Sequence, residues 1–83
     1  MLIHSPKNLA LLVKDRRKKL KLSQAEAADL VGLKQKTISA FENKPESVKL
    51  DTLFRILSAV RLDMILLGKE QPNLTKASWN EEW

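Results

Sequence analysis

The chain has 83 residues and no cysteine, and its 15 lysine and arginine residues outnumber 10 aspartate and glutamate residues, a formal net charge of +5. This length allows one domain with a small core, and the lack of cysteine excludes a disulfide framework or a thiol-ligated metal site. With no apolar run of about 20 residues and no signal peptide, the sequence favours a soluble, cytoplasmic protein.

The positive charge is unevenly distributed along the chain. Residues 1–49 hold 11 basic and 5 acidic residues, a net charge of +6, whereas residues 50–83 hold 4 basic and 5 acidic residues, a net charge of −1. A cationic half of this kind indicates a polyanionic partner such as nucleic acid.

The first predicted helix covers about residues 6–20. Ser5 is a good N-cap, Pro6 takes the first helical position, and apolar residues recur on one face. The last two turns carry four consecutive basic residues, Arg16, Arg17, Lys18 and Lys19. This run either compensates the negative end of the helix dipole or contacts DNA.

Two shorter helices are expected next. Ser23 and Glu26 form a capping box for a helix of about two turns that ends at Val31, where Gly32 can take a left-handed conformation. A third helix is predicted over about 34–43, with Ile38 and Phe41 on its inner face and Pro45 ending it.

A fourth helix is predicted over about 50–60. Its apolar stripe is interpreted as core and consists of Leu50, Leu53, Phe54, Leu57 and Val60. The following segment, 61–67, is predicted to be a strand with two apolar faces, although a continuation of the fourth helix is the alternative.

The predicted strand has no partner within the chain, so a second copy is its simplest partner. The expected dimer interface is Leu62, Met64, Ile65 and Leu66. Residues 68–83 have few apolar residues and are expected to be a flexible tail. The fold class is therefore all-α, with a domain of about four helices and one short strand in residues 1–67.

Two short helices joined by a glycine turn in a basic all-α domain indicate a helix-turn-helix. Ala28 allows close helix approach, Gly32 makes the turn, and Ile38 anchors the second helix in the core. The outward face of the third helix then carries Lys34, Gln35, Lys36, Ser39, Ala40 and Asn43. These residue types suit a DNA major groove, and residues 34–41 include no acidic residue.

Residues 9–60 resemble the helix-turn-helix domain of phage repressors. The resemblance rests on Ser23-Gln24, on the spacing Gln24, Ala28, Gly32, Ile38, and on the pair Phe41-Glu42. It implies that Arg17 of the first helix pairs with Glu42. The chain departs from the family at Ala27, where leucine is usual, which affects packing there.

The wider layout is similar to the HipB antitoxins, the DNA-binding partners of HipA-type kinase toxins. The similar stretch is "LKQKTISAFENKPESVKLDTLFRILSAVRLDMILL", followed by the terminal "EEW". The resemblance implies a homodimer that binds a palindromic operator, represses its own toxin–antitoxin operon and restrains the kinase. It assigns base contacts to Lys34, Gln35, Lys36 and Ser39, phosphate contacts to Gln24 and Thr37, and toxin contacts to the tail. Asn43 is a further predicted phosphate contact, and the two tryptophans of the tail, Trp79 and Trp83, are the predicted toxin contacts because tryptophan often dominates binding energy.

Three other readings compete with this one. A free-standing phage-type repressor shares every feature except the tail. An enzyme is disfavoured, because His4 is the lone histidine and no phosphate loop, histidine pair or cofactor motif is present; a small basic ribonuclease would need an acid and a base that the sequence does not identify. A pure protein-interaction module does not explain the acid-free face of the third helix.

Overall fold

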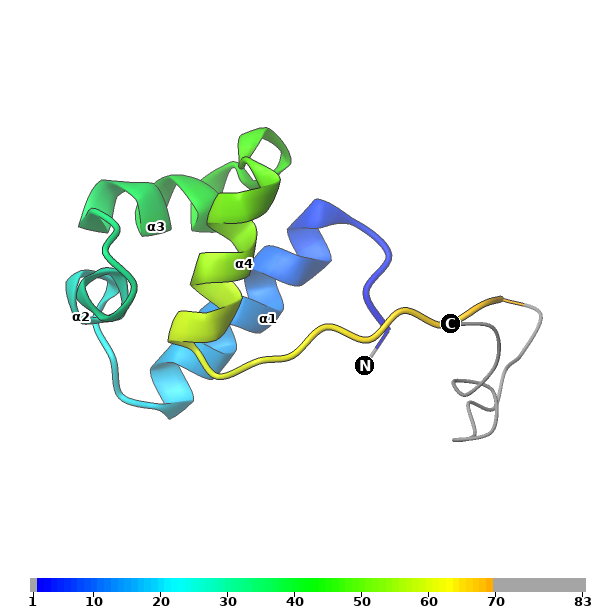
Figure 1. Cartoon of the computed structure of the whole chain (residues 1–83), viewed down its shortest axis with the longest axis horizontal. Coiled ribbons are helices and arrows are strands. Elements are labelled where there is room, and N and C mark those ends of the chain that lie inside the picture. The colour runs from blue at the N-terminus through cyan, green and yellow to red at the C-terminus, as the bar shows by residue number, and fades with distance from the viewer. Residues whose placement is uncertain (1, 70–83) are drawn as a thin grey trace.

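The computed structural model describes residues 2–69 of the chain. In that range it contains the α-helices α1 (Pro6–Lys19), α2 (Gln24–Leu30), α3 (Gln35–Asn43) and α4 (Leu50–Ala59), the short 3₁₀ helix η1 (Pro45–Ser47), and no strand. Figure 1 shows α2 and α3 together on one side of the molecule, with α4 crossing in front of α1. The predicted all-helical architecture of four helices is confirmed.

Local side-chain caps start the first two helices. The Ser5 Oγ accepts a hydrogen bond from the Asn8 backbone N–H at 3.1 Å, and Pro6 opens α1. At α2, the Ser23 Oγ accepts from the Glu26 N–H at 3.0 Å, and the Glu26 carboxylate accepts from the Ser23 N–H at 2.8 Å. The capping box therefore satisfies two backbone donors at the start of a helix of only seven residues.

Three helices end in a left-handed residue. Lys21 (φ 60°), Gly32 (φ 70°) and Arg61 (φ 59°) follow α1, α2 and α4. The next residue in each case donates its N–H to a carbonyl five residues back: Leu22 to Arg17 at 3.1 Å, Leu33 to Ala28 at 2.9 Å, and Leu62 to Leu57 at 3.0 Å. These are Schellman-type helix ends. The sequence predicted the left-handed turn at Gly32 but not the other two, because lysine and arginine give no such signal.

The core lies between the four helices. Its largest fully buried side chains are Val13 of α1, Ile38 and Phe41 of α3, and Ile56 and Val60 at α4. The interpretation of the α4 stripe as core is wrong for two members, since Leu50 is 67% exposed and Phe54 is 51% exposed. The helix turns the side that carries Leu53, Ile56, Leu57 and Val60 towards the core, which leaves Leu50 and Phe54 on the flank.

The chain leaves the helices after α4. Arg61 has a left-handed φ of 59°, so the alternative that the fourth helix continues through 61–67 is wrong. Residues 62–68 have no assigned secondary structure, and their trace runs away from the bundle in Figure 1. Within residues 2–69, the backbone of 63–67 makes no hydrogen bond to another backbone group. Pairing with a second copy stays a prediction.

Candidate nucleic-acid interface

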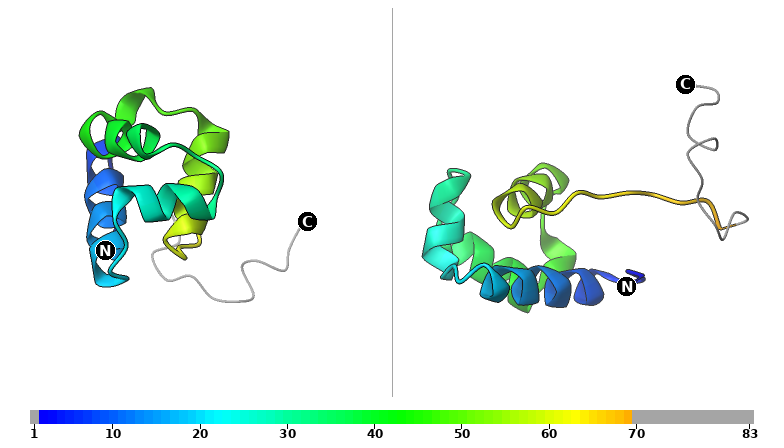
Figure 2. Two further views of the ribbon diagram at one scale, coloured as in Figure 1. Left: turned by 90° about the vertical axis from the view of Figure 1, so that its left-hand side faces the viewer. Right: turned by 90° about the horizontal axis from the view of Figure 1, so that it is seen from below.

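The helix-turn-helix is formed by α2 and α3, which face the viewer in the left panel of Figure 2. Ala28 is completely buried beneath the turn, and Ile38 is buried where α3 meets the core. Side-chain atoms beyond the Cβ of a larger residue at 28 would push the two helices apart, so the small alanine sets their distance. Ala27 is also buried, so the methyl group that replaces the family's usual leucine lies in the packed interior.

Gly32 makes the turn between these helices for a conformational reason. A Cβ added there would meet no atom within 4 Å, so space does not require glycine. The backbone conformation requires it instead: the φ of Gly32 is +70°, and a residue with a side chain is strained in this left-handed region.

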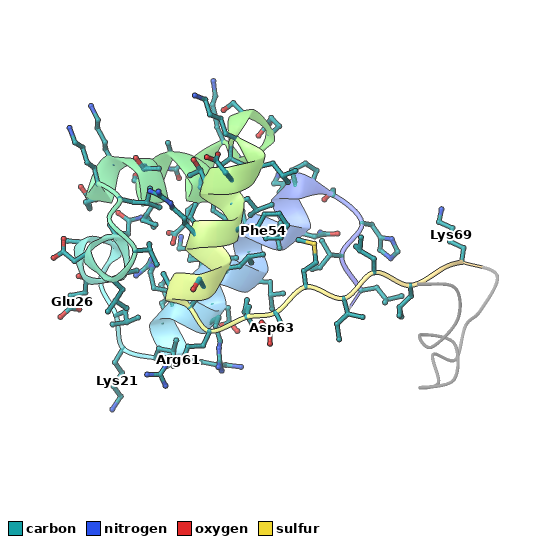
Figure 3. The ribbon with its side chains drawn as sticks, viewed as in Figure 1. Lys21, Glu26, Phe54, Arg61, Asp63 and Lys69 are labelled. Atoms are coloured by element: carbon teal, nitrogen blue, oxygen red, sulfur yellow. The ribbon has the colours of Figure 1, made fainter. Side chains whose placement is uncertain are left out.

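The predicted base-contacting residues lie on the outer face of α3 and at its start. Lys34, Gln35 and Lys36 are exposed, and Ser39 is partly exposed. Figure 3 shows nitrogen-tipped side chains projecting outward from this part of the molecule. The helix begins at Gln35, one residue later than predicted, because Lys34 is its N-cap and supplies no side-chain hydrogen bond.

A buried ion pair fixes α3 to α1. The Arg17 Nε donates to Glu42 Oε2 at 2.8 Å, and a second guanidinium nitrogen donates to Glu42 Oε1 at 3.0 Å. The Arg17 side chain is 10% exposed and that of Glu42 is 3% exposed. A third donor of Arg17 reaches the Leu22 carbonyl at 2.9 Å, which ties the loop before α2 to the same pair. A bidentate pair of this kind holds α3 in one orientation.

The network continues to the exposed surface at the start of α3. The Gln24 side-chain amide nitrogen donates to Glu42 Oε1 at 3.0 Å, and the Gln24 amide oxygen accepts from the Gln35 amide at 2.7 Å. The structure therefore joins a predicted phosphate contact, Gln24, directly to a predicted base contact, Gln35. Through Glu42, both glutamines are connected to the buried Arg17.

The charge state of Glu42 follows from this network. Desolvation by burial, the largest single influence, acts to raise the pKa of Glu42. The hydrogen bonds from Arg17 and Gln24 and the nearby positive charges outweigh it, and the pKa lies below the ordinary value of 4.5. Glu42 is therefore ionised at neutral pH.

The remaining predicted phosphate contacts flank the centre of α3. Thr37 is partly exposed, and Asn43 is exposed at the last position of the helix. The Asn43 amide donates to the Ser39 Oγ at 3.4 Å, a long bond on the surface. This contact brings together Ser39, a predicted base contact, and Asn43 on one side of α3.

Two cations near this surface were missed by the sequence analysis. Lys44 and Lys49 line, with Lys36 and Thr37, an open pocket of about 360 Å³ between α3, η1 and the start of α4. The sequence feature that could have indicated them is their position before and after Pro45. Pro45 begins η1, where the chain turns beside α3. They extend the positive surface beyond α3.

Some site types are absent from the part of the chain that the structure describes. Among residues 2–69, no group of three or more histidine, cysteine, aspartate or glutamate side chains could hold a metal ion. No helix in this range is long and apolar enough to cross a membrane. The predicted toxin contacts, Trp79 and Trp83, lie outside the described residues, as does nearly all of the tail predicted over 68–83.

Comparison with known protein families and sequences gives a consistent result. A helix-turn-helix family model matches residues 13–67. The antitoxin HipB of Escherichia coli strain K12 is 40% identical over 83 residues, which cover 98% of this chain and 93% of that protein. The antitoxin HigA1 of Mycobacterium tuberculosis (strain CDC 1551 / Oshkosh) is 40% identical over 67 residues, which cover 77% of this chain and 43% of that protein.

Solved structures agree with the sequence relatives. A complex of HipB with a 20-mer called O4 has a TM-score of 0.80 and 40% identity, covering 83% of this chain and 97% of that chain. A HipA-HipB-O2-O3 complex matches with the same TM-score, identity and coverage. We expected a binding protein and not an enzyme, and this is confirmed, because the relatives are antitoxins with a helix-turn-helix domain.

Proposed function

Because the chain belongs to the helix-turn-helix family and, within it, to the HipB antitoxins, we propose that it is a sequence-specific DNA-binding antitoxin. In this proposal it dimerises, represses its own toxin–antitoxin operon, and binds and neutralises a HipA-type kinase toxin in the cytoplasm. The observation that carries the proposal is the exposed, acid-free face of α3, held in place by a hydrogen-bond network from the core.

Base reading is assigned to the start and outer face of α3. Gln35 uses one amide N–H to bind Gln24, which leaves its second N–H and its carbonyl oxygen for the two-point contact that glutamine makes with adenine. Lys34 and Lys36 reach guanine acceptors, and Ser39 permits close approach of the helix to the groove floor. The bond to Gln24 limits the rotamers of Gln35 before DNA arrives, which lowers the entropy cost of binding.

Phosphate contacts are assigned to Gln24, Thr37 and Asn43. Gln24 retains one amide N–H after binding Glu42, and this donor can reach a phosphate oxygen. Such contacts fix the protein on the duplex without reading sequence. Lys44 and Lys49 add to the same electrostatic attraction.

Dimerisation is assigned to the extended segment after α4. Leu62 is partly buried, whereas Met64, Ile65 and Leu66 are exposed beside an unpaired backbone. Pairing with the same segment of a second copy would satisfy that backbone and cover these side chains. Two recognition helices about 34 Å apart would then read the half-sites of a palindrome.

Toxin binding is assigned to Trp79 and Trp83 of the tail, because tryptophan often dominates binding energy. The HipA-HipB-O2-O3 complex, in which HipB is assembled with HipA, supports a HipA-type protein as the partner. A free-standing repressor, the alternative function, would need no such contact.

The experiment is calorimetric titration of the purified toxin with the full chain and with a chain lacking residues 79–83. We expect the truncated chain to bind toxin more weakly and to bind operator DNA with unchanged affinity. Equal toxin affinities of the two chains would show that residues 79–83 do not contribute to toxin binding. If neither chain binds the toxin, the free-standing repressor is favoured.

A further inference from the structure

The C-terminal end of α4 is tied to α1 by one arginine. The Arg16 Nε donates a hydrogen bond to the Val60 backbone carbonyl at 3.1 Å, although the two residues are 44 positions apart. Val60 is the C-cap of α4, and within residues 2–69 no backbone N–H donates to its carbonyl oxygen. Carbonyls at a helix end lack a partner in their own helix and are free to accept from a side chain. Arg16 therefore caps α4 from a different helix.

This end of α4 is where the chain changes direction. Arg61 has a left-handed φ of 59°, and the Leu62 N–H donates back to the Leu57 carbonyl at 3.0 Å. Val60 is 1% exposed, whereas all residues of 63–67 are exposed. The Val60 carbonyl is thus a buried point of attachment directly before the turn. Figure 3 labels Arg61 at this end of α4, from which the extended segment leaves the helices.

The next residue of α1 is tied to the recognition helix. Arg17 donates two hydrogen bonds to Glu42 of α3, at 2.8 Å and 3.0 Å. Consecutive residues lie about 100° apart around a helix, so the guanidinium groups of Arg16 and Arg17 reach different neighbours. Both α3 and the point where the extended segment begins are therefore attached to the same two residues of α1.

In a dimer that reads a palindrome, the angle between these two attachments has a consequence for DNA binding. If two copies pair through 61–67, the direction in which this segment leaves the domain sets the distance and rotation between the two α3 helices. We propose that Arg16 is a positioning residue for operator recognition: by holding the Val60 carbonyl it fixes this direction, and with it the half-site spacing that the dimer accepts. The inference rests on the proposed function and goes beyond it by giving a role in DNA recognition to a residue outside the DNA interface.

The contact distinguishes Arg16 from the other cations of its run. The sequence left two roles open for residues 16–19, compensation of the helix dipole and contact with DNA. Lys18 and Lys19 are exposed, and the Lys19 ammonium lies 3.4 Å from the Asp15 carboxylate in a surface pair of a kind that contributes little. Arg16 is partly buried, and its Nε is directed at a carbonyl of another element. A charged donor of this kind makes one of the stronger hydrogen bonds in proteins.

The first test compares the wild type with full-length Arg16→Met, which keeps an apolar side chain but removes the donor. Each protein is titrated with the palindrome upstream of its own operon and with the same palindrome carrying one extra central base pair, which rotates the half-sites by about 35°. We expect the wild type to prefer the native spacing and Arg16→Met to reduce that preference about 10-fold, an effect that one charge-assisted hydrogen bond can supply. An undiminished preference in Arg16→Met would overturn the inference.

Two further variants separate this role from a general effect of charge. Lys18→Met removes an exposed cation of the same run and should keep the wild-type spacing preference, and Arg16→Lys retains a charge and a donor and should keep most of it. The affinity of Arg16→Met for the palindrome should fall with salt as steeply as that of the wild type, because no phosphate contact is lost. A salt slope smaller by about 1 would instead identify Arg16 as a phosphate contact and refute the inference. The same relaxation in Lys18→Met would also refute it.

The second test needs no DNA. Because the chain has no cysteine, Ala40→Cys places a single spin label on the exposed side of α3 in each protomer. Electron paramagnetic resonance of the dimer should give one narrow distance between the two labels with Arg16 and a broader distribution with Arg16→Met. Distributions of equal width would contradict the proposed role. Urea denaturation of both labelled proteins verifies that they are folded.

The titrations also separate this inference from the proposed function on which it rests. A wild type that binds the palindrome no more tightly than a shuffled duplex would overturn both. A wild type that reads the palindrome with a spacing preference that Arg16→Met retains would overturn the inference alone.

Discussion

Lys21 adopts a left-handed backbone conformation at the end of α1, where glycine is usual. A Cβ in this conformation destabilises the folded state by about 1–2 kcal/mol. Glycine avoids this strain, but its greater conformational freedom in the unfolded chain offsets about 0.5–1 kcal/mol of the gain. We therefore expect Lys21→Gly to raise the free energy of unfolding by about 0.5–1 kcal/mol in urea denaturation. Lys21→Ala is the control: it removes the charge but keeps the Cβ, and an equal gain from alanine would contradict the explanation by strain.

Glu42 links the stability of the domain to pH. Its pKa is lowered in the folded state, so its contribution is fully present above the ordinary value of 4.5 and is lost as the pH falls through the lowered value. Glu42→Gln leaves Arg17 as a buried charge without its partner, and we expect a loss of about 3 kcal/mol at pH 7.

Thermal unfolding of both proteins as a function of pH measures this effect. The difference in stability between wild type and Glu42→Gln should be constant above about pH 5.5 and should shrink below pH 4.5. A difference that stays constant down to pH 3 would show that the charge of Glu42 is not responsible.

Gln35 and Gln24 are hydrogen-bonded to each other, but their replacement should affect DNA binding in different ways. Gln35→Ala should reduce discrimination at one or two base pairs by about 1–3 kcal/mol each, whereas Gln24→Ala should weaken binding to all sequences. Binding to operator variants with single base-pair changes measures both effects. Equal losses on operator and random DNA for Gln35→Ala would argue against base reading.

The sequence specified some of these contacts and not others. The Arg17–Glu42 pair follows from the family resemblance, because both positions belong to a recurring motif. The 2.7 Å bond between Gln24 and Gln35 could not be predicted, since it depends on the angle and distance between α2 and α3. Lys44 and Lys49 were missed because their place beside α3 depends on how η1 and the start of α4 pack against that helix.

At the scale of elements, helix ends with local signals were well predicted. Ser5 with Pro6, and Ser23 with Glu26, act through backbone groups within four residues, so sequence alone places the starts of α1 and α2. The face of α4 was predicted less well. A helical period shows that the apolar stripe is wide, but it does not separate the part covered by the chain's own core from a flank that a partner would cover.

The extended segment after α4 gives a prediction about assembly. Ile65 is 65% exposed in the single chain, so a lysine there should leave the fold intact. In the proposed dimer the same lysine would be buried against the second copy at a high desolvation cost. Sedimentation should show Ile65→Lys as a folded monomer at concentrations where the wild type is a dimer. A dimer of unchanged affinity would reject the proposed strand interface.

For the whole molecule, the division of charge matches the division of roles. The net charge of +6 in residues 1–49 includes the recognition helix, and the net charge of −1 in residues 50–83 includes the predicted dimer segment and tail. The electrostatic attraction to DNA is therefore expected to come from residues 1–49. Operator affinity should fall steeply with salt, because each neutralised phosphate releases counterions.

The central claim is that this chain reads a specific DNA sequence. Fluorescence anisotropy at physiological salt can compare its affinity for the palindrome upstream of its own operon with its affinity for a shuffled duplex of equal length. The account predicts binding to the palindrome at least about 10³-fold tighter than to the shuffled duplex, the lower limit for sequence-specific regulators. Equal affinity for both duplexes would contradict it.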